Sequence, residues 1–425
     1  MEKIGLQPFM QGIYKLEETQ NLRCTMLGIG PMSENLIEAV FLLAKQKDFP
    51  VMFIASRNQV DADEFGGGYV CSWNQDTFRR DIAKIAEKCG YQGLYYLCRD
   101  HGGPWQRDKE RNDKLPVREA MELGKRSYLY DLKAGFDLLH IDPTKIPDVG
   151  EVAPMDMVLD LTMELIEYCE EQRKALGLPP VAYEVGTEET NGGLTSVESY
   201  NEFINTLVAR LKAEGLPTPT FIVGQTGTLT RLTENVGHFN ADQAVALSKA
   251  ARIHGVGLKE HNGDYLSPFI LELHPALGIT ATNVAPEYGV VETQTLLRLA
   301  KIEEWLFERK MIPSQSQFHD VFARASIESQ RWRKWMVGEV REYTVDQVLA
   351  DKELAGQVVE ICGHYTFNDD AVKGEIAKMY ANLEGAGLNP HRIVVNAVMK
   401  SIERYVDAFN LEGITSKVMQ VLGKA

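Results

Sequence analysis

The stretches VMFIAS (51–56) and GLYYLCR (93–99) decide the fold. Each is a short, β-rich apolar run, and the segment between them has apolar residues at helical spacing over 75–90. The same alternation recurs along the chain as far as residue 309. Further strands are predicted at 23–30, 138–142, 181–187, 220–225, 256–260 and 278–284. Further helices are predicted at 33–48, 115–135, 155–176, 197–214, 240–254, 267–275 and 289–309.

Eight successive strand–helix units favour a closed parallel barrel, because an open doubly wound sheet usually has about five to seven strands. Glycine or proline marks most steps from helix to strand, as at Gly135 and Gly278. From residue 308 onward the alternation stops, and only helical patterns follow, near 316–337, 345–362, 369–384, 390–409 and 414–423. The sequence therefore predicts an α/β protein, a (β/α)8 TIM barrel over 1–307 with an all-helical extension over 308–425.

Composition excludes several classes of partner. The net charge of −15 argues against nucleic acid and anionic membranes, since both need basic surfaces. The first twenty residues lack the apolar core of a secretory signal, and no apolar run reaches the roughly 20 residues of a membrane span. The six cysteines form no C-x-x-C pair, so neither a zinc ribbon nor a redox motif is indicated, and in a chain of this size we expect reduced thiols. We expect a cytoplasmic protein.

Polar and ionisable residues follow seven of the eight predicted strands. A TIM barrel builds its active site at these carboxyl-terminal strand ends, whereas a packed core needs no such residues. We therefore expect the substrate to be contacted by Asn58, Gln59, Asp142, Gln225, Asp264 and Asn283. His140 lies inside a strand, where a packed core histidine is the alternative, and His364 is expected to have no role in the site.

The histidines and carboxylates at the strand ends indicate a metal site. His101 and His261, with a carboxylate from the fifth or fourth strand, would make a three-ligand site open to substrate, which suits Zn, Mn or a similar divalent ion. Such an ion polarises a ketose carbonyl and stabilises an enediolate or alkoxide. Asp100 or Glu188 would move the proton as the catalytic acid or base.

Several motifs resemble those of one family. They are ASRNQVDADEFGGGY (55–69), RDHGGPW (99–105), AGFDLLHIDPT (134–144), YEVGTEETNGG (183–193) and KEHNGDY (259–265). In this order they resemble the family known as the non-catalytic subunit of class II D-tagatose-1,6-bisphosphate aldolase. That family was formerly labelled a tagatose-6-phosphate kinase and includes fructose/tagatose 4-epimerases. The former kinase label is not favoured, because the sequence contains no G-x-x-x-x-G-K-[ST] phosphate loop.

A more distant resemblance is to the class II fructose-bisphosphate aldolases. It implies that Asp100 is the catalytic aspartate, that His101 and His261 are metal ligands, and that Asn283 contacts the substrate. The aldolase motif G-T-x-H corresponds to Gly186-Thr187-Glu188, so the resemblance implies that Glu188 replaces the remaining histidine ligand. The arginine-rich segment of the family's tail is replaced by FNDDAVK (367–373), which indicates a free or differently charged sugar.

Two functions are compatible with these observations. The first is a metal-dependent enzyme that acts on a tagatose- or fructose-like ketose or ketose phosphate, by aldol cleavage or by C3/C4 epimerisation. The second is a non-catalytic subunit that stabilises a class II tagatose-1,6-bisphosphate aldolase. The expected partners are a sugar or sugar phosphate, a catalytic aldolase subunit under the second hypothesis, and further copies of the same chain in a homo-oligomer.

Overall fold

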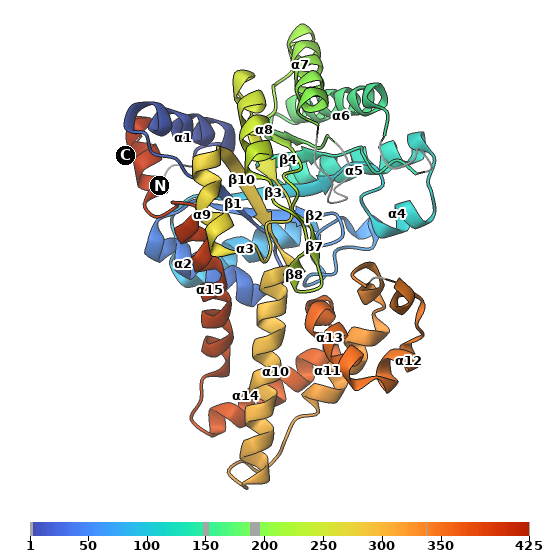
Figure 1. The fold of residues 1–425 in the computed structure, drawn as a ribbon. Helices are drawn as coiled ribbons and strands as arrows, with labels where there is room; N and C mark the ends of the chain where they lie inside the picture. Colours follow the sequence, from blue (N-terminus) through green and yellow to red (C-terminus); the bar gives the residue numbers. More distant parts are fainter. Residues whose placement is uncertain (1–2, 148–152, 188–195, 337, 425) are drawn as a thin grey trace.

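The computed structural model describes residues 3–147, 153–187, 196–336 and 338–424. Its centre is a closed barrel of eight parallel strands, in which each strand pairs with its neighbours in chain order and the last pairs with the first (Figure 1). The predicted barrel is therefore confirmed. The barrel strands are β1 (Met26–Ile29), β2 (Val51–Ser56), β3 (Tyr95–Gly102), β4 (Leu138–Ile141), β5 (Ala182–Val185), β6 (Phe221–Val223), β9 (Gly257–Glu260) and β10 (Ile279–Val284).

Helices surround the barrel, and each predicted one is present. Glycines end several of them in the left-handed conformation, where a side chain would be strained; Gly135 has φ 77° and Gly278 has φ 80°. This is the physical basis of the glycine signal between helix and strand. The helices are α2 (Glu34–Lys47), α3 (Gln75–Cys89), α5 (Val117–Ala134), α6 (Met155–Ala175), α7 (Val197–Ala213), α8 (Ala241–Ile253), α9 (Pro268–Leu277) and α10 (Pro286–Glu308).

Four smaller elements were not predicted. Helix α1 (Leu6–Gln20) precedes the barrel and buries an apolar face against it and against the last helix of the chain. The loop after β3 contains the short α4 (Asp108–Asn112), and a two-stranded hairpin, β7 (Thr230–Arg231) and β8 (Glu234–Asn235), follows β6. These elements add to the two ends of the barrel without changing its topology.

The chain after α10 is helical, as predicted. The helix expected at 316–337 ends earlier, because α11 stops at Glu328 and a 3-10 turn follows at Arg331–Lys334. The helix expected at 345–362 is divided by Asp351, whose side chain caps the second part. The helices are α11 (Phe318–Glu328), α12 (Val345–Ala350), α13 (Lys352–Cys362), α14 (Asp370–Gly385), α15 (Pro390–Ala408) and α16 (Ile414–Val421).

The extension packs in two different ways (Figure 1). Helices α11 to α14 surround the far half of the long helix α10 and have their own apolar clusters. Helices α15 and α16 return to the barrel, where α15 packs on α2 and α16 on α1, and their apolar residues belong to the barrel's core cluster. Within the described parts of the chain, no helix has the length and apolar character needed to cross a membrane.

Candidate metal centre

Four ionisable side chains from four neighbouring regions of the barrel meet at its carboxyl-terminal end. Asp100 comes from β3, His140 from β4, Glu184 from β5, and His261 directly follows β9. All four are buried, and each offers one nitrogen or oxygen atom such that the four atoms lie within 4.8 Å of one another. Strand register explains part of this, because His140 is paired with Glu184 and the two side chains share the inner face.

Glu184 is held by two cationic or polar neighbours. Its Oε1 lies 2.8 Å from His261 Nε2, and its Oε2 accepts a 2.5 Å hydrogen bond from Lys259 Nζ. Burial alone would raise the pKa of Glu184, but the positive charges of Lys259 and the two imidazoles outweigh it and lower that pKa to about 2. The carboxylate is therefore ionised, as a metal ligand must be.

Asp100 faces the same cluster. Its Oδ1 accepts a 3.0 Å hydrogen bond from Asn283 Nδ2, and lies 3.7 Å from His140 Nδ1 and 3.8 Å from His261 Nε2. Burial would raise its pKa, yet the nearby imidazoles outweigh burial and hold the pKa well below the usual range. The residue before it, Arg99, points away from the barrel axis and pairs with Asp131 of α5, as the alternation of a strand requires.

His140 is part of the centre, although the sequence left open a packed core role for it. Its Nδ1 accepts a 3.0 Å hydrogen bond from the backbone amide of His101, which fixes the ring orientation. Its buried Nε2 has no hydrogen-bond partner among the described residues. A buried polar atom without a partner is costly, and a ligand or substrate would relieve that cost.

His101 lies beside this centre with a partner of its own. Its Nδ1 is 2.8 Å from Asp142 Oδ2, while Asp142 Oδ1 accepts a 2.5 Å hydrogen bond from Thr144 Oγ1. Its ring centroid is 4.9 Å from that of His261 and 5.3 Å from that of His140. His101, His140 and Asp142 thus form a second group whose ligand atoms lie within 4.8 Å of one another.

The remaining predicted residues differ in their surroundings. Gln59, Asp264 and Asn283 line a pocket of about 210 Å³ together with Asp100, His101 and His261. The carboxylate of Asp264 also accepts hydrogen bonds from the amides of Ala285 and Glu287 at the start of α10. Burial and the neighbouring Glu287 raise its pKa to about 7.

Three predicted residues lie apart from that pocket or outside the described chain. Asn58 hydrogen-bonds Gln106 and Asp108 in the loop after β3. Gln225, two residues after the end of β6, is buried and is not part of the pocket lining. Glu188, predicted as ligand and acid or base, lies outside the described residues.

The helical extension forms the roof of the pocket. Trp335, His364 and Tyr365 line it opposite the barrel residues, with Tyr69 from the loop after β2. Two cations stand beside these rings: Arg331 lies 4.9 Å from the centroid of Tyr69, and Lys334 Nζ lies 4.9 Å from that of Tyr365. The sequence favours a tail that packs on the barrel or builds a subunit contact, but no local pattern identifies these residues as part of the pocket.

Known proteins agree with this architecture. The family model described as "D-tagatose-1,6-bisphosphate aldolase subunit GatZ/KbaZ-like" matches residues 13–410. The crystal structure of a probable tagatose 6 phosphate kinase from Sinorhizobium meliloti 1021 is similar at 21% identity and a TM-score of 0.65, over 90% of this chain and 100% of that chain. None of the curated proteins matches the sequence.

Two further crystal structures share the fold at lower identity. Fructuronate-tagaturonate epimerase UxaE from Cohnella laeviribosi has 14% identity and a TM-score of 0.54, over 91% of this chain and 81% of that one. Fructose-bisphosphate aldolase from Campylobacter jejuni has 12% identity and a TM-score of 0.52, over 96% and 95%. At such identities the likeness concerns the fold alone, whereas the family match spans nearly the whole sequence. The chain belongs to the D-tagatose-1,6-bisphosphate aldolase subunit GatZ/KbaZ-like family.

Proposed function

We propose that this chain is a metal-dependent enzyme that acts on a ketose or ketose phosphate, by aldol cleavage or by epimerisation at C3 or C4. The observation that carries the proposal is the convergence of four buried ionisable side chains beside a pocket at the barrel mouth. A purely structural core would not place two carboxylates and two imidazoles together there.

The donor set fits a divalent metal. His140, Glu184 and His261 would hold it, with Asp100 at the edge of the site, and the mixture of imidazole and carboxylate donors suits Zn or Mn. His140 and Glu184 take the places that the sequence suggested for His101 and Glu188. When bound, the ion would polarise the carbonyl of the sugar and stabilise negative charge on its oxygens.

The protein residues supply proton transfer and orientation. Asp100, whose Oδ1 is held by Asn283, keeps Oδ2 for a proton exchanged with a substrate hydroxyl or carbon. Its low pKa keeps it ionised in the resting state. Asp142 orients His101 at the rim, and Gln59 lines the pocket wall. Removal of a hydroxyl proton or of a carbon-bound proton needs the same arrangement, so both reactions suit the site.

The roof favours a sugar with an anionic end. Lys334 has no carboxylate partner among the described residues, and the nearest one to Arg331 is Asp108 at 3.7 Å. Arg331 therefore keeps hydrogen-bond donors for an anion, and Lys334 adds a point charge. These two cations provide positive charge in place of the arginines that segment 367–373 lacks, which supports a ketose phosphate over a free ketose.

A second candidate function rests on the family's description as an aldolase subunit. The chain would then stabilise a separate class II aldolase, and the buried cluster of charged side chains would have no catalytic role. Mixing experiments separate the two functions, because only the subunit hypothesis requires the second chain to gain activity or stability.

The decisive experiment is proton NMR of the purified chain alone, supplied with Zn or Mn, on tagatose, fructose, sorbose, psicose and their phosphates. A new epimer or triose fragments, absent in a Glu184→Gln variant and present in His391→Ala, would support the enzyme. His391 is a matched control because it is a half-exposed histidine outside the centre. No conversion of any sugar by metal-loaded protein would contradict the proposal.

A further inference from the structure

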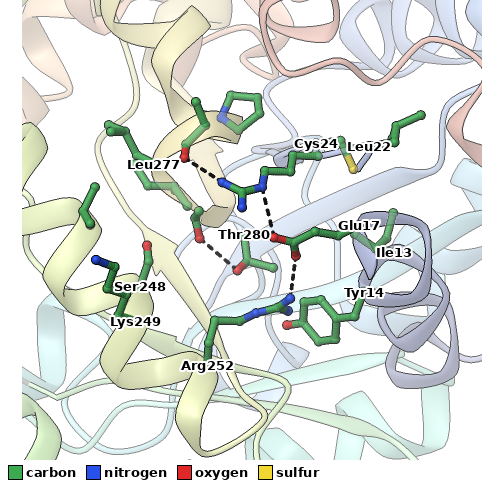
Figure 2. Close-up of a pocket in the computed structure, with 16 residues that line it drawn as sticks. Ile13, Tyr14, Glu17, Leu22, Cys24, Ser248, Lys249, Arg252, Leu277 and Thr280 are labelled. Carbon is green, nitrogen blue, oxygen red and sulfur yellow. Dashed lines mark hydrogen bonds and ion pairs between the residues drawn. The ribbon is translucent and has the colours of Figure 1, made fainter. Parts of the chain in front are cut away.

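A second pocket lies at the opposite end of the barrel from the candidate metal centre. Its lining residues precede β1 and β10 or end helices α8 and α9, so it sits at the amino-terminal ends of the strands. Helix α1 closes one side of it (Figure 2). The cavity measures about 200 Å³. We propose that this pocket binds a small phosphate-bearing anion.

The charge of the pocket is the first argument. Glu17 is the only acidic residue among the described residues that line it, and it is shared by two arginines. Its Oε1 lies 3.0 Å from Arg23 Nε, and its Oε2 lies 2.5 Å from Arg252 Nη2 (Figure 2). With Lys249 the lining carries three cations against one carboxylate, on a chain whose net charge is −15. An anion would balance this local excess.

Hydrogen-bond donors are also available. Ser248 is 4% exposed, and its buried Oγ has no partner among the described residues. Ser248, Lys249 and Arg252 lie about one turn apart on α8 and line the pocket together with Val245, as the helical spacing requires. A phosphate oxygen can accept from a hydroxyl, an ammonium and a guanidinium together, and would satisfy the orphaned hydroxyl.

The arginine is already positioned for this role. The guanidinium of Arg252 lies 3.8 Å from the ring centroid of Tyr14, and Glu17 fixes one of its nitrogens. Such a stacked and paired side chain loses little further freedom when it binds an anion. The remaining walls are apolar, formed by Ile13, Leu22 and Leu277, so the ligand can carry a short carbon body.

Isothermal titration calorimetry of the full chain with inorganic phosphate, in buffer without added metal, tests this site. The background is Lys334→Gln, which weakens anion binding at the barrel mouth. In that background we expect phosphate binding that is about 10- to 100-fold weaker after Arg252→Gln or Lys249→Gln, as for loss of a charge-assisted hydrogen bond. Ser248→Ala should weaken binding while leaving the ion pairs of Glu17 intact.

Two outcomes would overturn the proposal: no phosphate binding at millimolar concentrations in the background chain, or equal affinity in all three variants. The melting temperature without phosphate identifies a variant that fails to fold, and Ser248→Ala is then the informative one. Ketose turnover is measured in parallel. The pocket is remote from the metal centre. If the phosphate-site proposal is wrong, turnover is therefore unaffected. If the proposed enzyme activity is absent, phosphate binding is unaffected.

Discussion

The side-chain amide of Asn283 donates a 3.0 Å hydrogen bond to the carboxylate of Asp100, joining the end of β10 to the end of β3 across the barrel mouth. Gly28 of β1 makes room for this contact. A Cβ atom at Gly28 would lie 2.2 Å from Asn283 Oδ1, which is closer than such atoms approach in proteins. The position of Asp100 therefore depends on the absence of a side chain at residue 28.

Gly28→Ala should displace Asn283 and release Asp100. We expect ketose turnover to fall about 10- to 100-fold, the usual effect of losing a supporting hydrogen bond around a metal site. Metal content, measured by inductively coupled plasma mass spectrometry, should stay unchanged, since the proposed ligands do not move. Gly356→Ala in α13 is the control, because nothing lies within 4 Å of its added Cβ. Unchanged turnover in Gly28→Ala would remove Asn283 from the proposed machinery.

The metal ligands can be distinguished by parallel substitutions. His261→Ala and His140→Ala should lose both bound metal and turnover, because each removes an imidazole of the proposed ligand set. His101→Ala should retain the metal, because the parent His101 pairs with Asp142 and is not in the proposed ligand set, but it should lose activity through the change at the pocket rim. If His101→Ala loses the metal and His140→Ala keeps it, the ligand set is the one first suggested by the sequence.

Lys334→Gln and Arg331→Gln test the anionic end of the substrate. We expect KM for a ketose phosphate to rise about 10- to 100-fold in each, as for loss of a charge-assisted hydrogen bond. The kcat/KM for the unphosphorylated ketose should stay constant. Lys373→Gln is the control, since that lysine is half-exposed and pairs with Asp370. Equal losses on both sugars would mean that the roof cations position the pocket and do not recognise a phosphate.

The burial of His364 should make the stability of the folded chain sensitive to acid. Burial, with Lys334 and Arg331 nearby, lowers its pKa from 6.5 to about 3, so the folded chain keeps this imidazole neutral while the unfolded chain protonates it. The contribution of the neutral His364 to the free energy of unfolding is fully present above pH 6.5. It decreases as the pH falls from there toward 3, by about 2 kcal/mol near pH 5.

The measurement is urea denaturation between pH 8 and about pH 5. His364→Gln should show a flatter dependence of the free energy of unfolding on pH than the parent chain. His319→Gln, in which an exposed histidine of α11 is replaced, should follow the parent. A parallel slope in His364→Gln would show that this imidazole is not buried neutral in solution.

Breaking the buried ion pair between β3 and α5 should lower the free energy of unfolding strongly. Arg99 and Asp131 are both 0% exposed and are joined at 2.8 Å and 2.5 Å. Asp131→Ala leaves a buried guanidinium without its counter-ion, so the free energy of unfolding should fall by about 3–5 kcal/mol. Asp113→Ala, which breaks the exposed pair with Lys109, should leave the denaturation midpoint in place. A small effect in Asp131→Ala would mean that water reaches Arg99.

The barrel could be predicted because its signals are local. Each strand is a short apolar run, each helix has a 3.6-residue period, and glycines such as Gly135 mark the joints. Helix α1 was missed although its signal was present, since Leu6, Phe9, Ile13 and Leu16 have helical spacing and are all buried.

The site was predictable where its residues stand next to polar loop residues near a strand end, and hidden where apolar neighbours surround them within a strand. Asp100, His261 and Asn283 could be located because loop-proximal polar residues at strand ends stand out. Glu184 and His140 sit among apolar neighbours, and only the pairing of β4 with β5 brings them together. Their presence within buried strands was itself a signal, since ionisable residues are rarely buried without a partner. The roof residues depend on tertiary packing that no local pattern encodes.

The roof is carried by a segment fastened at both ends: α10 leaves the barrel beneath it, and α15 returns to pack on α2. The carboxylates and imidazoles stand on strands, whereas Trp335, Lys334 and Tyr365 belong to this separate segment. Related genes can therefore change the roof residues in evolution while they retain the strand residues. Under the proposed function, substitutions in the roof would change the choice of sugar across a lineage, while the strand residues and the proposed reaction pass on unchanged.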